Sequence, residues 1–128
     1  MIFGIGTDIV DVERIAQKVQ KGEGFVKQAF SEKEIEYCNK QANPAESYAA
    51  RFAAKEAFLK ALGQGLQATV ELFKIEVDVQ ESGKPFLELH EDIQFIVSLA
   101  ADQANFATHV SMSHTKTVAM ATVVLEIL

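Results

Sequence analysis

The chain has 128 residues, of which 48% are hydrophobic and 23% charged, and its formal net charge is −6. This length fits a single domain over residues 1–128, and the hydrophobic content excludes a disordered chain. The excess of acidic groups argues against nucleic acid as the main partner.

The expected compartment is the cytoplasm. No apolar run approaches the ~20 residues that a membrane span needs, so we expect no membrane association. The N-terminus lacks a basic region before an apolar run, which argues against a signal peptide. A single cysteine, Cys38, allows no internal disulfide and suits a reducing compartment.

The first predicted element is a strand over residues 2–10, because its side chains alternate between two faces. One of these faces carries Gly4, Gly6 and Asp8. Glycine weakens a strand and often marks the close approach of a ligand or of another backbone. Asp8 is therefore a candidate for contact with a ligand. The alternative is that it solvates the strand end or caps the helix that follows.

A helix over residues 11–21 comes next, with Asp11 as its expected N-cap. Arg14, Lys18 and Lys21 follow one another at i, i+4 and i+7, so they form a basic stripe on this helix. Residues 1–30 hold four basic and four acidic groups, which leaves the whole acid excess beyond residue 30. The stripe is either a binding surface for an acidic partner or an ordinary solvated helix face.

Two further helices follow. Ser31 and Glu34 form a capping box that predicts a helix over residues 32–40. The run Asn43-Pro44-Ala45-Glu46 predicts the start of a long helix, which ends at Gly63. This long helix is apolar nearly all round, which predicts a central position in the fold.

Within the long helix, Glu56 lies beside Phe52 and Leu59 and should be partly desolvated. A buried carboxylate then needs a cation, and Lys60 follows four residues later. The plain interpretation is a surface pair worth about 0.2–0.5 kcal/mol. The functional interpretation is that Glu56 meets a metal ion and Lys60 a ligand phosphate. Two carboxylates are too few for calcium but are what magnesium takes when substrate phosphates supply other oxygens. Asp8 with Glu56 would therefore imply a phosphate-bearing substrate.

The C-terminal half predicts two strands over residues 72–80 and 85–90, a helix over 91–104, and strands over 108–114 and 117–128. By default Lys84 and Pro85 belong to a hairpin turn, and Ser113 and His114 to a strand end. The predicted fold is α+β, with five mostly antiparallel strands and a central long helix.

Five segments resemble one known family in order along the chain: "GIGTDIVDVERI", "FSEKEIEYC", "RFAAKEAFLKALGQG", "KIEVDVQESGKPFLEL" and "HVSMSHTKTVAMATVV". The chain is similar to the holo-[acyl-carrier-protein] synthases, the small bacterial branch of the 4′-phosphopantetheinyl transferase superfamily. The resemblance implies that fold and a transfer of the phosphopantetheine arm of coenzyme A to a serine of apo acyl carrier protein. Adenosine 3′,5′-bisphosphate would be released, and the reaction would serve fatty acid biosynthesis.

The resemblance also implies roles for individual residues. Asp8 and Glu56 match the family's catalytic magnesium ligands, with Mn²⁺ as an alternative metal. The positions that match its coenzyme A contacts are Lys60, Gly63, Gly65, Lys84, Pro85, Ser113 and His114. Arg14, Lys18 and Lys21 lie where the family docks its acidic carrier protein. The glycines beside Asp8 would leave room for the ligand, and a homotrimer with sites between protomers is expected.

Other functions and details stay open at this point. A non-catalytic module that binds coenzyme A or a nucleotide would keep Lys60 and the glycine loop, but it would not need both Asp8 and Glu56. A structural oligomerisation domain would leave the basic stripe unexplained. The general base is not fixed, and Asp8 or Glu56 acting through a metal-bound water is our interpretation. Departures from the family pattern, such as Gln64 between the two glycines, concern loop details and the preference among acyl-coenzymes.

Overall fold

The structure is a computed structural model that describes residues 1–63 and 70–128. In chain order its elements are β1 (Ile2–Asp11), α1 (Val12–Gln20), α2 (Glu23–Ala29), α3 (Glu32–Asn39), α4 (Pro44–Leu62), the 3₁₀ helix η1 (Leu72–Lys74), β2 (Ile75–Val79), β3 (Pro85–Leu89), α5 (Glu91–Ala100), β4 (Phe106–His114) and β5 (Val118–Ile127). The predicted α+β class with a long central helix is confirmed.

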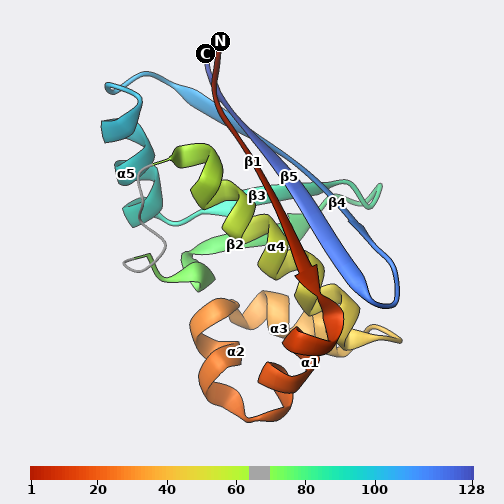
Figure 1. Cartoon of the computed structure of the whole chain (residues 1–128). Coiled ribbons are helices and arrows are strands. Elements are labelled where there is room, and N and C mark those ends of the chain that lie inside the picture. Colours follow the sequence, from red (N-terminus) through yellow and green to blue (C-terminus); the bar gives the residue numbers. More distant parts are fainter. Residues whose placement is uncertain (64–69) are drawn as a thin grey trace.

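The described strands form two antiparallel sheets. The larger has the order β1-β5-β4, and the smaller pairs β2 with β3. Figure 1 shows α4 running along the larger sheet, while α1, α2 and α3 gather at one end of the molecule and α5 lies toward the other. The two termini lie side by side, where Met1 and Ile127 exchange backbone hydrogen bonds of 2.8 and 2.7 Å.

Contact between β1 and α4 is made backbone to backbone. A Cβ atom on Gly4 would lie 1.9 Å from the carbonyl oxygen of Ala61, and one on Gly6 would lie 1.8 Å from that of Ala57. The glycines therefore let the helix approach the strand, so the expectation that they leave room for a ligand is wrong. The central position predicted for α4 is confirmed, since twelve of its residues are buried.

Most of the predicted helix ends are confirmed. Ser31 and Glu34 form the predicted capping box, with backbone-to-side-chain distances of 3.2 and 2.9 Å. Gly63 ends α4 in the left-handed conformation, with φ of 71°. Asp11 and Asn43 occupy the N-cap positions as predicted, but neither side chain makes a capping hydrogen bond.

Three elements differ from the prediction. Helix α2 was not predicted, because Gly22 and Gly24 interrupt the helical pattern; ring contacts of its Phe25 with Phe30 and Phe52 hold it in place. The strand predicted from residue 72 begins at Ile75, after η1. Helix α5 ends at Ala100 rather than at 104, because the next turn carries two residues with positive φ.

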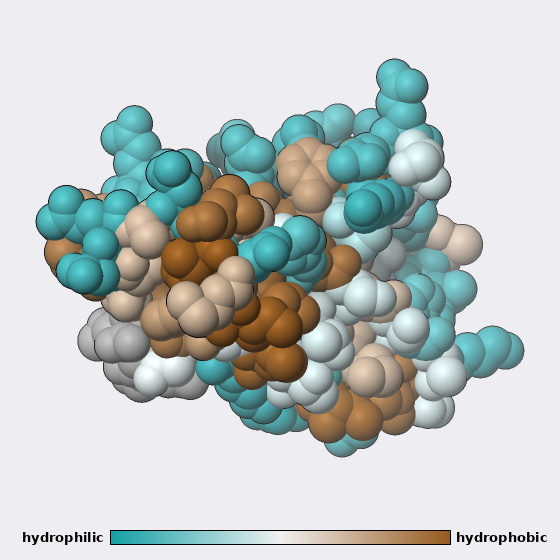
Figure 2. Space-filling model, turned by 90° about the horizontal axis from the view of Figure 1, so that it is seen from above, coloured by the Kyte–Doolittle hydropathy of each residue, from teal (hydrophilic) through white to brown (hydrophobic). Residues whose placement is uncertain are grey.

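Apolar side chains remain exposed on two surfaces. The face of the larger sheet away from α4 carries Ile5, Ile9 and Met120, which are 61%, 70% and 41% exposed. Figure 2 looks onto the end with the termini and shows apolar side chains gathered into a patch. The exposed large apolar residues of the termini and of α5 are Met1, Ile2, Leu128, Phe95 and Leu99. Among the described helices, none combines the length and the apolar composition that crossing a bilayer requires.

Candidate functional site

Asp8 faces α4 and is held by a lysine. The Lys60 ammonium lies 3.0 Å from Asp8 Oδ1 and 2.9 Å from the carbonyl oxygen of Thr7. The Asp8 side chain is 17% exposed and that of Lys60 is 49% exposed, so the pair stands at the edge of the sheet–helix contact. The structure thus brings Asp8 and Lys60 together across 52 residues of sequence.

Glu56 completes this group from the same face of α4 as Lys60, one helical turn earlier. Burial raises the pKa of Glu56, and the nearby charge of Asp8 raises it further. The positive charges of Lys60, Lys18 and Arg14 act in the opposite direction. The desolvation that the sequence predicts for Glu56 is therefore present, and two carboxylates stand close enough to repel each other.

The donor set suits a magnesium ion. No group of three or more histidine, cysteine or acidic side chains in the described part of the chain is arranged to hold a metal. Asp8 and Glu56 could supply the two carboxylates that magnesium commonly accepts when phosphate oxygens and water complete its shell. Their mutual repulsion, eased here by an ammonium, is what a divalent cation would also relieve.

A buried ion pair fixes the helix directly beside Glu56. Lys55 Nζ lies 2.7 Å from Glu34 Oε1 and donates to the carbonyls of Leu72 and Ile75 at 3.0 and 2.6 Å. Glu34 also accepts the backbone N–H of Val77 at 2.9 Å. Burial lowers the pKa of Lys55, and the charge of Glu34 opposes this. The pair ties α3, η1 and β2 to α4, and so fixes the rotation of the helix that presents Glu56.

Two of the other predicted coenzyme A contacts, Ser113 and His114, lie near the opposite end of α4. His114 ends β4, and its Nδ1 lies 3.2 Å from Glu46 Oε1, in the first turn of α4. Ten residues separate Glu46 from Glu56, or about 15 Å along a helix. Ser113 is exposed beside His114. The structure therefore does not bring Ser113 and His114 to the carboxylates within one chain.

Lys84 and Pro85 belong to the hairpin of β2 and β3, away from Asp8 on β1. Lys84 is exposed in the turn between β2 and β3, and Pro85 begins β3. Gly63 lies at the C-cap of α4, one turn beyond Lys60. Gly65 lies outside the described residues.

The basic stripe borders the carboxylates. Arg14 and Lys21 are exposed and Lys18 is half-buried, with its ammonium 5.3 Å from the centroid of the Phe25 ring and 5.9 Å from that of Phe52. The charges of Arg14 and Lys18 act on Glu56, which places this end of the stripe close to the candidate metal ligands. An acidic partner on the stripe would therefore stand next to the site.

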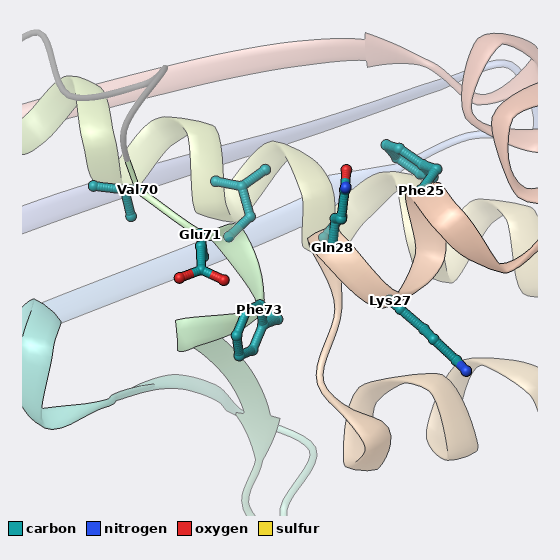
Figure 3. A pocket seen from close by; sticks show the side chains of 8 residues that line it. Phe25, Lys27, Gln28, Val70, Glu71 and Phe73 are labelled. Carbon is teal, nitrogen blue, oxygen red and sulfur yellow. The ribbon is translucent and has the colours of Figure 1, made fainter.

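A cavity of about 460 Å³ opens between α2 and η1. Figure 3 shows its two walls, with Phe25, Lys27 and Gln28 on one side and Val70, Glu71 and Phe73 on the other. Neither candidate metal ligand lines it. Since Phe25 also contacts Lys18, the cavity extends the surface of the basic stripe rather than that of the carboxylates.

Sequence reasoning missed two contacts. The capping box identified Glu34 but gave no sign that its carboxylate also pairs with Lys55, 21 residues away. Glu46 was read only as a helix-start residue, whereas it contacts His114 across 68 residues. Both partners are set by tertiary packing, and local spacing carries no signal for them.

Comparison with known proteins places this geometry in a family. The model of the 4′-phosphopantetheinyl transferase superfamily matches residues 4–122. A holo-[acyl-carrier-protein] synthase of Cytophaga hutchinsonii is 43% identical over 98% of both chains, and one of Geobacter sulfurreducens is 44% identical over 98% of both. The crystal structure of the Neisseria meningitidis synthase has a TM-score of 0.85 at 33% identity and covers 98% of this chain and 99% of that one.

A second solved structure includes a ligand. The Bacillus anthracis synthase in complex with CoA (3′,5′-ADP) has a TM-score of 0.79 at 35% identity, covering 100% of this chain and 99% of that one. These similarities run over nearly the full length of the proteins compared. The chain belongs to the holo-[acyl-carrier-protein] synthases of the 4′-phosphopantetheinyl transferase superfamily.

Proposed function

We propose that this protein transfers the 4′-phosphopantetheine arm of coenzyme A to a serine of apo acyl carrier protein, releasing adenosine 3′,5′-bisphosphate. The observation that carries the proposal is the convergence of Asp8, Glu56 and Lys60 on the contact between β1 and α4, in a chain of this family. Two carboxylates and an ammonium form a site for a metal-bound pyrophosphate. The serine nucleophile belongs to the carrier, so this chain needs no nucleophile of its own.

Asp8 and Glu56 would hold Mg²⁺, or Mn²⁺ in its place. The metal would neutralise charge on the pyrophosphate as the phosphoanhydride bond breaks. Glu56 must be ionised for this role, and the positive charges of Lys60, Lys18 and Arg14 favour the ionised form. We assign no general base beyond these two carboxylates.

Lys60 would contact the coenzyme A pyrophosphate as a point charge. Its present partners, the Asp8 carboxylate and the carbonyl of Thr7, both accept hydrogen bonds. The ammonium therefore already lies beside groups that carry negative charge. Asp8 cannot be fully engaged by Lys60 and by a divalent ion at the same time. We therefore propose that Lys60 turns from Asp8 to the ligand phosphate when the metal is bound.

The basic stripe would dock the carrier protein. Arg14, Lys18 and Lys21 give an acidic partner a positive surface on a chain that is otherwise negative. The cavity beside Phe25 adds apolar surface at the same place. A carrier held there would present its serine toward the carboxylates, because Lys18 and Arg14 already act on Glu56.

We also propose a homotrimer with sites shared between protomers. Ser113 and His114 lie apart from Glu56 within one chain, and we propose that the coenzyme reaches both groups by binding between two chains. The exposed apolar face with Ile5, Ile9 and Met120 supports such an assembly, since soluble monomers rarely leave such a face uncovered. Light scattering of the purified protein would measure the mass, and Ile9→Lys should dissociate the assembly.

We place the reaction in the cytoplasm, as a step that prepares the carrier for fatty acid biosynthesis. The substrate chemistry supports this, since coenzyme A and acyl carrier proteins serve acyl transfer inside cells. The single thiol, Cys38, is buried and free, and burial raises its pKa to about 12, so it stays protonated and unreactive.

The decisive experiment is incubation with coenzyme A, Mg²⁺ and an apo carrier protein, followed by intact mass measurement of the carrier. We expect a mass gain equal to one phosphopantetheine group, and none when Mg²⁺ is removed with a chelator. A non-catalytic module that binds coenzyme A would leave the carrier mass unchanged while still binding the coenzyme.

A further inference from the structure

The contact between Glu46 and His114 has no part in the function proposed so far. Glu46 Oε1 lies 3.2 Å from His114 Nδ1, and the two side chains are 15% and 45% exposed. Glu46 belongs to the first turn of α4, after Pro44, and its backbone N–H donates to the carbonyl of Asn43 at 3.1 Å. The carboxylate is thus held at the start of a helix, and the histidine is the more exposed partner.

The chemistry of the two groups fixes where the histidine proton lies. A carboxylate only accepts hydrogen bonds, so Nδ1 must carry the proton in this contact. Nε2 is then the nitrogen that remains for a ligand. A phosphate at Nε2 also only accepts, so a ring bridging the two anions must donate from both nitrogens as the imidazolium.

We propose that Glu46 is a positioning residue for coenzyme A: by holding Nδ1 of His114, it fixes the ring orientation and leaves Nε2 for a ligand phosphate. This rests on the proposed function, which makes His114 a contact of the coenzyme. Glu46 acts on the ligand only through His114. Carboxylates that orient histidines in this way in metal sites change ligand affinity by about 10- to 100-fold.

The other charged groups around His114 are few among the described residues. Lys116 lies two residues on, in the exposed turn before β5. Asp11 ends β1 and pairs in register with Val118, next to Ala119, which is opposite His114. Of these groups only Glu46 is in hydrogen-bonding contact with the ring, so it is the group whose removal should matter.

An ordinary structural role makes a different prediction. Glu46 is an acidic residue in the first turn of a helix, where it also stabilises the helix dipole. Glu91 is likewise an acidic residue in the first turn of its helix, α5, is exposed and lies outside the proposed site, so it provides a control. A helix-dipole effect would be the same whether or not residue 114 is histidine.

The test is a double-mutant cycle on coenzyme A binding, measured by calorimetry in Mg²⁺ with the full-length protein. We expect Glu46→Ala and His114→Ala each to weaken binding about tenfold. The double variant should bind no more weakly than His114→Ala alone. Glu46→Gln keeps an acceptor for Nδ1 and should bind more tightly than Glu46→Ala, and Glu91→Ala should bind like the wild type.

Two results would overturn the proposal. One is a Glu46→Ala defect that persists unchanged in the His114→Ala background. The other is wild-type affinity in Glu46→Ala. The turnover number at saturating coenzyme A should change little in Glu46→Ala, because the residue is remote from the carboxylates. If the wild type fails to modify a carrier at all, the proposed reaction is wrong, and that outcome is separate from the binding cycle.

Discussion

A Cβ atom on Gly6 would lie 1.8 Å from the carbonyl oxygen of Ala57. The same relationship holds between Gly4 and Ala61, so β1 and α4 meet along two successive helical turns without side chains between them. This close contact is what lets Asp8, two residues beyond Gly6, reach Lys60 at 3.0 Å. The spacing of the candidate site is thus set by two glycines that pack against the backbone of α4.

Gly6→Ala should therefore damage both fold and site. The added methyl group meets backbone on α4, which cannot turn aside as a side chain could, so the helix must shift. We expect a loss of at least about 1–3 kcal/mol in the free energy of unfolding, measured with urea. The control is Gly24→Ala in α2, where an added Cβ meets nothing within 4 Å. It should be neutral or more stable by roughly 0.5–1 kcal/mol. Equal stabilities for the two variants would contradict the close-contact role of Gly6.

Local patterns in the sequence predict most of the elements but not their partners. Alternation predicts β1, and the proline and glycine signals predict both ends of α4, because these features depend on neighbouring residues. Helix α2 has no such pattern, since packing of Phe25 against Phe30 and Phe52 holds a segment that glycines weaken. Tertiary packing overrides local propensity there.

The buried pair of Lys55 and Glu34 gives a second test. Lys55→Met leaves the Glu34 carboxylate buried without its cation, and we expect a loss of about 3–5 kcal/mol in the free energy of unfolding. The matched control is Lys40→Met, which removes an exposed pair with Glu36 and should change stability by less than about 1 kcal/mol. Adding Glu34→Gln to Lys55→Met should restore part of the loss, because the buried charge is then gone. No recovery would show that Lys55 acts through packing alone.

Glu56 predicts a pH dependence of stability in the metal-free protein. Burial is the main cause that raises the pKa of Glu56 in the folded protein above the ordinary 4.5. At pH values between 4.5 and this higher native pKa, the folded protein therefore binds more protons than the unfolded chain. Stability contributed by this group must then fall as pH rises through that window. Glu56→Gln lacks the group, so the difference in unfolding free energy between wild type and variant should decrease with rising pH. A difference that is constant from pH 4 to 8 would contradict the raised pKa.

The same variant tests the metal. Glu56→Gln keeps the shape of the side chain but removes a negative ligand, so phosphopantetheine transfer should collapse while the fold survives. Direct titration with Mn²⁺, followed by its paramagnetic signal, should show weaker binding than in the wild type. Near-normal turnover at saturating Mg²⁺ would remove Glu56 from the proposed metal site.

The candidate site was only partly predictable from sequence, for a physical reason. Asp8, Glu56 and Lys60 are recognisable because carboxylates and a lysine beside apolar helix positions need partners, and the structure brings these three together. The partners of His114 and Lys55 are 68 and 21 residues away, in Glu46 and Glu34. Such contacts depend on how α4 is placed against β4 and α3, which local spacing does not encode.

The basic stripe gives the last prediction. Acyl carrier proteins are acidic as a class, and this chain has a net charge of −6, so long-range repulsion would slow their encounter unless a local patch reverses the field. Arg14→Glu with Lys18→Glu should raise the Michaelis constant for the carrier at least about tenfold at low salt. Because both groups also favour the ionised form of Glu56, coenzyme A binding is measured beside the carrier kinetics, and we expect the carrier constant to change far more than coenzyme A affinity. The control reverses Lys33 on α3 and Lys40 at its C-cap, which pair with Asp78 and Glu36, lie outside the cavity lining and change the net charge equally. The affinity of the wild type for the carrier should weaken as salt shortens the Debye length toward ~3 Å at 1 M. If the stripe variant and the control lose the same affinity, net charge alone explains the effect, and the docking role of α1 is wrong even where the transfer reaction is intact.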